Sequence, residues 1–300
     1  MVETDLIRPP VVLDTDSSVG PLPGEIRLAL NKDWREALRF GCRRQTLFEG
    51  MAQLTPAMPE PWAHGPVFIG SGDFHHLSWP LILRCLSQQE QRIDVVVLDN
   101  HPDNMRFPWG IHCGSWVHEV AKLPQVAQVH VIGITSGDIG FGHVWEHHLG
   151  ALYARKVTYW SSGVNVKWAS RLGLASCFRR FPDLDTLTLA ASEHLAHSPR
   201  PVYLSIDKDV FAPDVLRTNW DQGNMQEPHL RSLLKAVRGR ILGSDVTGDV
   251  STWQYHSAWK RWLSSADGQN TAGEQADLAQ WQARQHQFNL QLNRWLHELR

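Results

Sequence analysis

The sequence has 300 residues, of which 42% are hydrophobic, and its formal net charge is −2. This length and composition are enough for one large domain with a sizeable core. The scattered basic residues argue against a nucleic-acid-binding surface, and no apolar run is long enough for a membrane span. Since the N-terminus shows no basic segment followed by an apolar run, we expect a soluble, cytoplasmic protein.

Short apolar runs alternate with longer amphipathic segments along the chain. Strands are predicted at residues 10–13, 66–69, 93–98, 129–134, 156–160 and 202–206, and from residue 241 onward. Helices are predicted over 26–48, where apolar residues recur at three- and four-residue spacing, and over 77–88. The alternation predicts an α/β fold with a mainly parallel sheet covered by helices on both faces.

The C-terminal part is also predicted to be helical. We expect a single domain over residues 1–300, with 270–300 as a C-terminal helical extension. One apolar helical face is formed by Leu278, Trp281, Phe288, Leu292, Trp295 and Leu296. Packing of this face on the domain is favoured, and the alternative is a contact within a homo-oligomer.

Three potential metal ligands follow the strand predicted at 93–98. Asp99, His101 and Asp103 stand at alternate positions, so extended backbone would place them on one side. In open α/β sheets, ligands bind in the crevice at the carboxyl ends of the strands. The pattern therefore predicts a metal site, while the alternative is that the aspartate caps a helix and Asn100 and Pro102 mark a turn.

A second acidic motif strengthens the metal interpretation. Asp207 and Asp209 follow another apolar strand, again at alternate positions. Several carboxylates so close together repel one another unless a cation neutralises them. A third strand leads through a glycine-containing turn to His75 and His76. These oxygen and nitrogen ligands suit Mn²⁺ or a similar divalent ion.

Two further stretches are candidates for chemistry. The glycine-flanked loop 109–116 contains His112, a candidate proton shuttle or substrate contact if the loop folds over the metals. The alternative is a solvated loop histidine. Near the N-terminus, Asp14 and Asp16 follow the first predicted strand. They fit either an aspartyl nucleophile or, as we favour, an ordinary turn.

The order of these motifs resembles that of the arginase and agmatinase (ureohydrolase) family. The resemblance covers residues 67–249 and rests on Gly-Ser-Gly-Asp-Phe-His75, Asp99-Asn-His101-Pro-Asp103 and Ser-Ile-Asp207-Lys-Asp209. It implies a three-layer α/β/α sandwich that holds two Mn²⁺ ions and uses a bridging hydroxide. One metal would be held by His75, Asp99, Asp103 and Asp207, and the other by Asp99, His101, Asp207 and Asp209.

The sequence also departs from the family pattern. The family histidine usually follows its aspartate directly, but here Phe74 intervenes, which leaves His75, the favoured ligand, or His76. A substrate-binding glutamate is expected where this chain has Gly248. Either the neighbouring Asp249 replaces it with a shifted reach, or the substrate is not a guanidine. Whether Asp221, in a stretch that lacks the family's glycine- and threonine-rich pattern, contacts the substrate is left open by the sequence.

The sequence thus predicts a binuclear manganese hydrolase. It would cleave a non-peptide carbon-nitrogen bond in a small guanidino, amidine or related linear amide compound, with His112 and Asp249 as catalytic residues. One alternative is a deacetylase-like amide hydrolase with a single Zn²⁺, against which Asp103 argues because it offers a ligand for a second metal. The other is a non-catalytic binding protein with the same fold.

Overall fold

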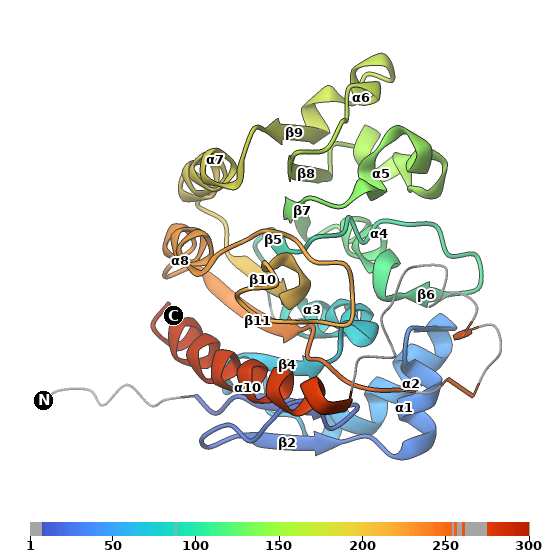
Figure 1. Cartoon of the computed structure of the whole chain (residues 1–300), viewed down its shortest axis with the longest axis vertical. Helices are drawn as coiled ribbons and strands as arrows, with labels where there is room; N and C mark the ends of the chain where they lie inside the picture. Colours follow the sequence, from blue (N-terminus) through green and yellow to red (C-terminus); the bar gives the residue numbers. More distant parts are fainter. Residues whose placement is uncertain (1–7, 88, 254, 257–259, 262–274, 300) are drawn as a thin grey trace, which may run out of the picture.

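A parallel sheet runs through the middle of the molecule (Figure 1). The computed structural model describes residues 8–87, 89–253, 255–256, 260–261 and 275–299. In this part of the chain nine strands form one sheet in the order β2-β1-β4-β11-β10-β5-β7-β8-β9, and every neighbouring pair is parallel. The strands are β1 Val11–Asp14, β2 Ile26–Ala29, β4 Val67–Gly70, β5 Ile93–Leu98, β7 Val126–Ile134, β8 Val157–Ser162, β9 Phe178–Phe181, β10 Val202–Asp207 and β11 Ile241–Thr247. A separate antiparallel pair joins β3 (Gly41–Cys42) to β6 (Ile111–His112).

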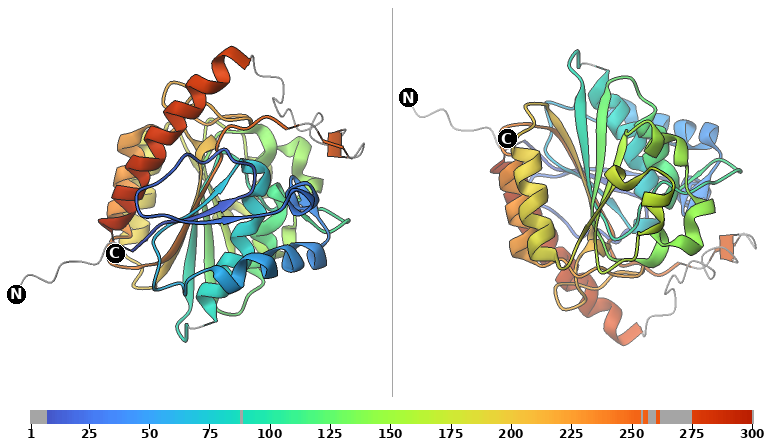
Figure 2. Two further views of the ribbon diagram at one scale, coloured as in Figure 1. Left: turned by 90° about the horizontal axis from the view of Figure 1, so that it is seen from below. Right: turned by 90° about the horizontal axis from the view of Figure 1, so that it is seen from above.

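Helices cover both faces of this sheet (Figure 2). One face carries α1 Lys32–Leu38, α2 Arg44–Leu54, α3 Ser78–Leu86, α4 Trp116–Ala121, α5 Leu149–Tyr153 and α6 Trp168–Arg171. The other carries α7 Leu184–Ala196, α8 Glu227–Ala236 and α10 Gln275–His297. Short 3₁₀ helices are η1 Thr55–Ala57, η2 Gly72–Leu77, η3 Cys113–Ser115, η4 Gly137–Ile139, η5 Phe141–Glu146, η6 Ala175–Cys177 and η7 Lys208–Val210. The predicted three-layer α/β/α sandwich with a parallel sheet is confirmed.

The central strand β5 shows why this sequence builds a doubly covered sheet. Val95 and Val97 pack into the core on the α3 and α4 side. Val96 and Leu98 pack into the core on the α7 and α8 side. Because successive side chains point to opposite faces, a continuous aliphatic run satisfies both layers at once.

The helix predicted over 26–48 is wrong. This stretch contains β2, α1, β3 and the beginning of α2. Asn31 caps α1, since its side chain accepts a hydrogen bond from the Trp34 amide at 3.0 Å. At Gly41 the chain approaches β6 so closely that an added Cβ would lie 2.7 Å from the Cβ of His112. The apolar spacing alone did not reveal that the predicted helix is interrupted before α1, at Asn31, and again at Gly41.

Edge strands were also missed. β2 pairs only with β1, and β9 pairs only with β8, within the described residues. The sequence of β9 is Phe-Arg-Arg-Phe, with both arginines exposed. Short, polar edge strands give a weak periodic signal in the sequence. Strands of this kind are also one way in which sheets avoid edge-to-edge aggregation.

The C-terminal helix α10 packs on the sheet side that also carries α7 and α8. Phe288, Leu292 and Leu296 are buried in that core. Residues 270–274 of the predicted extension lie outside the described residues. Among the helices that the structure describes, none combines the length and hydropathy needed to cross a membrane.

Candidate metal centre

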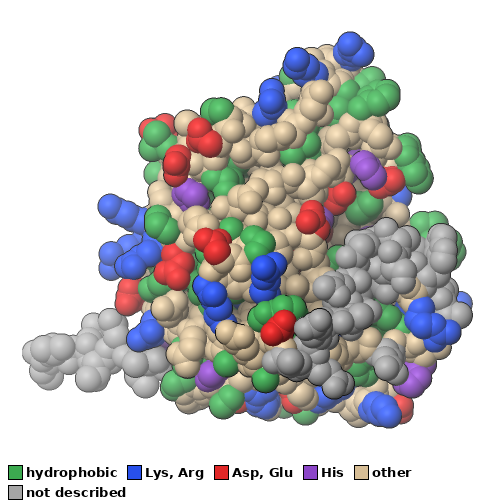
Figure 3. Space-filling model, viewed as in Figure 1, with side chains coloured by type: hydrophobic (Ala, Val, Ile, Leu, Met, Phe, Trp, Pro, Cys, Tyr) green, Lys and Arg blue, Asp and Glu red, His purple; other side chains and the backbone are tan. Residues whose placement is uncertain are grey.

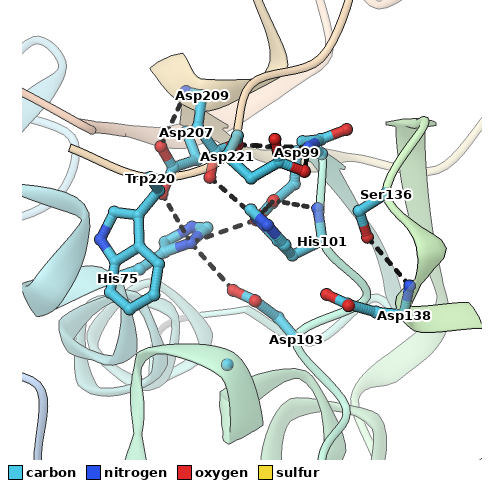
Figure 4. A network of polar contacts seen from close by, with 12 residues as sticks. His75, Asp99, His101, Asp103, Ser136, Asp138, Asp207, Asp209, Trp220 and Asp221 are labelled. Carbon is cyan, nitrogen blue, oxygen red and sulfur yellow. Dashed lines mark hydrogen bonds and ion pairs between the residues drawn. The ribbon is translucent and has the colours of Figure 1, made fainter. Parts of the chain in front are cut away.

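The ends of three strands bring the predicted ligands together (Figure 4). Asp99 directly follows β5, Asp207 is the last residue of β10, and His75 lies in η2 after β4. Each of these side chains is buried. The sheet order places β10 beside β5, so residues more than a hundred positions apart meet at one edge.

The first cluster surrounds a single imidazole nitrogen. His75 Nδ1 lies 2.9 Å from Asp103 Oδ2, and 3.3 Å from the Oδ2 atoms of both Asp99 and Asp207. On the other side of the ring, His75 Nε2 lies 2.9 Å from Ser205 Oγ, which donates to Asp245 Oδ1 at 2.7 Å. A proton on Nε2 donated to Ser205 leaves the Nδ1 lone pair free for a metal ion.

The second cluster shares one aspartate with the first. His101 Nδ1 lies 2.9 Å from Asp209 Oδ2 and 3.6 Å from Asp99 Oδ1. In each of two sets, His75, Asp99 and Asp103, and Asp99, His101 and Asp209, the potential ligand atoms lie within 4.8 Å of one another. Asp99 belongs to both sets, which is the arrangement that a carboxylate bridging two ions requires.

Backbone groups and one indole hold these carboxylates in place. The amide of His101 donates to Asp99 Oδ1 at 2.6 Å, and the amide of Asn100 donates to Asp209 Oδ1 at 3.1 Å. Trp116 Nε1 donates to Asp103 Oδ2 at 2.6 Å. Asp103 itself has a φ of +46°, a conformation rare outside glycine that is found at functional sites.

Burial and mutual repulsion raise the pKa values of three carboxylates in the cluster. Burial raises the pKa of Asp103 to about 7, and the neighbouring Asp99 charge adds to the shift. Burial and the Asp99 charge likewise raise the pKa of Asp209 to about 6. Burial, followed by the Asp209 charge, raises the pKa of Asp207. A bound cation favours the ionised form of such carboxylates, so this donor set fits divalent metal ions.

A cavity of about 450 Å³ opens above the cluster. Beyond the predicted ligands and His112, it is lined by Gly72, Met105, Cys113, Gly114, Asp138, His143, Glu146, Trp220 and Asp221. Its charged lining residues are acids and histidines, with no lysine or arginine among the described ones. The space-filling view shows acidic and histidine side chains right of the centre of this face (Figure 3).

The rim residues Asp138 and Glu146 were missed by sequence reasoning. Asp138 lies in η4 and Glu146 in η5, in the segment that follows the carboxyl end of β7, as the predicted ligands follow other strands. The rule that led to Asp99 could have led to Asp138 as well. Trp220 gave no such signal, because the long loop after η7 carries it to the cavity.

Comparisons with known proteins bear on the fold. No protein-family model matches the chain. An uncharacterized protein of Thermotoga maritima is 25% identical over 221 residues, which cover 73% of this chain and 70% of that protein. Proclavaminate amidino hydrolase of Streptomyces clavuligerus superposes with a TM-score of 0.52 at 14% identity, over 97% of this chain and 93% of that one. A hypothetical agmatinase of Burkholderia thailandensis gives a TM-score of 0.52 at 12% identity, over 97% and 86% of the two chains. The chain has the arginase-like fold. These superpositions establish the fold. At identities this low, the activity of this chain is a separate question.

Within the arginase-like fold, His112 lies at the cavity, where the sequence had suggested it. The ring is buried, and its Nδ1 accepts a hydrogen bond from the Gly114 amide at 3.0 Å. Burial lowers the pKa of His112 to about 3. The side chain is therefore a neutral imidazole at neutral pH, and acceptance at Nδ1 places its proton on Nε2.

Asp249, the other predicted catalytic residue, does not line the cavity. Its Oδ1 is 2.7 Å from Lys208 Nζ and accepts a hydrogen bond from Asn289 Nδ2 at 2.9 Å, and all three side chains are buried. Neither Asp249 nor His76 is among the residues that line the cavity, whereas Asp221 and His75 are. The geometry thus places His75, rather than His76, with the carboxylates, and the catalytic role of Asp249 stays a prediction without support from its position.

Proposed function

We propose that this protein is a binuclear metal hydrolase that cleaves a carbon-nitrogen bond in a small guanidino, amidine or related linear amide compound. The observation that carries the proposal is the sharing of Asp99 between two histidine and aspartate sets. A site for a single ion needs only one of these sets. The arginase-like fold, with an amidino hydrolase among its members, agrees with this chemistry.

The donor set favours Mn²⁺ as the metal. Carboxylate oxygens dominate it, two imidazoles complete it, and no thiolate belongs to either set. His75, Asp99, Asp103 and Asp207 would hold one ion, and Asp99, His101, Asp207 and Asp209 the other. When bound, two such ions supply a strong nucleophile at neutral pH and offset charge that develops on the substrate.

The other cavity residues would bind and orient the substrate. Asp138, Glu146 and Asp221 give the rim a negative charge, which attracts a guanidinium or amidinium cation. Trp220, whose ring centroid is 6.5 Å from that of His101, would cover one face of the substrate and exclude water. His112 would donate a hydrogen bond or move a proton from Nε2.

The proposal is tested by metal content together with turnover. Protein purified without chelator and loaded with Mn²⁺ should contain about two ions per chain, and should release urea or ammonia from a member of a guanidino and amidine panel. His101→Ala should lose metal and turnover. The matched control is His197→Ala, which removes an exposed histidine at the end of α7 and should change neither.

Each alternative gives a different result in the same experiment. One Zn²⁺ per chain and unchanged metal content in Asp103→Ala would indicate the deacetylase-like enzyme. Two bound ions without turnover on any substrate would favour a binding protein. A folded protein that takes up no metal after loading would contradict the proposal altogether.

A further inference from the structure

A second cavity lies on the other side of the segment 105–115, which contains His112. Its volume is about 640 Å³, within the range of small-molecule sites. It is lined by Arg43, Arg44, Arg106, Phe107, Pro108, Trp109, Gly110, Ile111, Ser115, Glu119 and His148. The segment 105–115 therefore contributes to both cavities, with Met105, His112, Cys113 and Gly114 facing the metal cluster.

The charge of this second cavity is opposite to that of the first. Three arginines line it against one acid, Glu119, which pairs with Arg44 at 2.6 Å and with Lys122 at 3.1 Å. Arg106 uses Nε to donate to the His147 carbonyl at 3.0 Å, and its terminal nitrogens make no hydrogen bond or ion pair within the part of the chain that the structure describes.

Arg43 is exposed, and among the described residues its side chain makes no hydrogen bond or ion pair. Together with Arg106 it offers two guanidinium groups at one cavity. Such groups recognise phosphate through paired hydrogen bonds.

An exposed indole stands beside these arginines. Trp109 is 65% exposed, although the loop that holds it is closely packed. Gly110 has a φ of +149°, and an added Cβ there would lie 2.1 Å from the Cys42 carbonyl oxygen. The ring of Trp109 contacts Phe107 edge to face, with centroids 5.4 Å apart. Planar rings and cations stack on such a surface.

We propose that this cavity binds a phosphate monoester that carries a planar ring, of the size of a mononucleotide. Arg43 and Arg106 bind the phosphate, and Trp109 stacks on the ring. The site shares no lining residue with the metal cavity, so it does not depend on the proposed hydrolase activity. It lies close enough to influence that activity, because the ring centroid of Phe107 is 4.6 Å from that of His112.

Calorimetric titration of the whole protein tests the site, with AMP, inorganic phosphate and adenosine as probes. AMP should bind more tightly than either of its parts. The double variant Arg43→Ala/Arg106→Ala should weaken AMP binding by about tenfold or more, the loss expected for charged hydrogen bonds. Trp109→Ala should weaken AMP and leave phosphate unchanged. Arg180→Ala, an exposed arginine on β9, is the matched control and should have no effect.

Binding of AMP at this second cavity must also be distinguished from binding of its phosphate at a metal centre. AMP affinity should persist in chelator-treated protein and in His101→Ala, which keeps this result independent of the proposed metal chemistry. Loss of AMP binding on metal removal, or equal affinity in the double arginine variant, would overturn the proposal. Equal affinities for AMP and inorganic phosphate would overturn recognition of the ring.

Discussion

At the scale of single residues, the candidate metal centre depends on how each ligand is oriented. His75 presents Nδ1 to three carboxylates because Ser205 and Asp245 occupy the far side of its ring. Gly248, with a φ of +89°, leaves room for Asp207, since an added Cβ would lie 2.5 Å from its Oδ1. The motifs predicted which residue types converge, but these supporting contacts come from β10 and β11 and are invisible in the local sequence.

We expect Ser205→Ala to weaken Mn²⁺ binding by roughly 10- to 100-fold, as loss of an outer partner of a histidine ligand does. The variant removes the group that fixes the imidazole proton and adds no bulk. Calorimetric titration with Mn²⁺ measures the change, and Ser192→Ala, a serine of α7 whose hydroxyl lies 3.1 Å from that of Ser232 on α8, is the control. Unchanged affinity in Ser205→Ala would show that His75 does not need this orientation.

At the scale of elements, prediction succeeded where a strand carried its own signal. The run 93–98 is aliphatic and buried on both faces, so β5 was predicted with its exact bounds. β2 and β9 were missed because an edge strand needs little apolar sequence. Asp138 follows β7 as Asp99 follows β5, so the same rule could have found it, whereas Glu146 lies further along, in η5, where the strand gives no signal.

A buried histidine on β7 should make the stability of the protein depend on pH. His130 on β7 is buried, and its Nδ1 accepts a hydrogen bond from Trp160 Nε1 at 3.3 Å. Burial lowers its pKa to about 3, against roughly 6.5 in an unfolded chain. Between these values the unfolded chain binds a proton that the folded protein does not. The contribution of His130 to the free energy of unfolding is therefore fully present above about pH 6.5. It is lost as the pH falls, by up to about 1.4 kcal/mol per pH unit.

His130→Asn should reduce this dependence, because the amide still accepts the Trp160 hydrogen bond but does not titrate. Urea unfolding of both proteins between pH 4 and 7 measures it, and the difference in their slopes isolates this histidine from the other buried ones. Parallel stability curves for the two proteins would contradict the assignment.

At the scale of the whole molecule, contacts between distant segments determine where Asp249 lies. The resemblance to the ureohydrolase family implied that Asp249 replaces a substrate-binding glutamate. In the structure Lys208, from the loop after β10, and Asn289, from α10, hold its carboxylate in the interior. No local pattern shows that Lys208, which lies between two candidate ligands, turns inward to meet Asp249, 41 residues later in the chain.

This buried pair yields a prediction about stability. Asp249→Ala would leave the Lys208 charge buried without its partner, at a cost of about 3–5 kcal/mol in the free energy of unfolding. The double variant Lys208→Met/Asp249→Ala removes both charges and should be less destabilised than the single one. Chemical denaturation of the three proteins measures this. An Asp249→Ala protein as stable as the parent, but without turnover, would restore Asp249 to a catalytic role.

The contacts of α10 also have a consequence for the order of events during synthesis. All of the candidate ligands lie between residues 75 and 209, so they leave the ribosome well before this helix. Asn289 accepts a hydrogen bond from Lys208 Nζ at 3.0 Å, and Gln285 Nε2 donates to the Gly248 carbonyl at 3.1 Å, so these contacts beside Asp207 form only afterwards. A nascent chain that lacks α10 thus carries every candidate ligand, but the contacts of this helix with Lys208 and Gly248 form only once it docks.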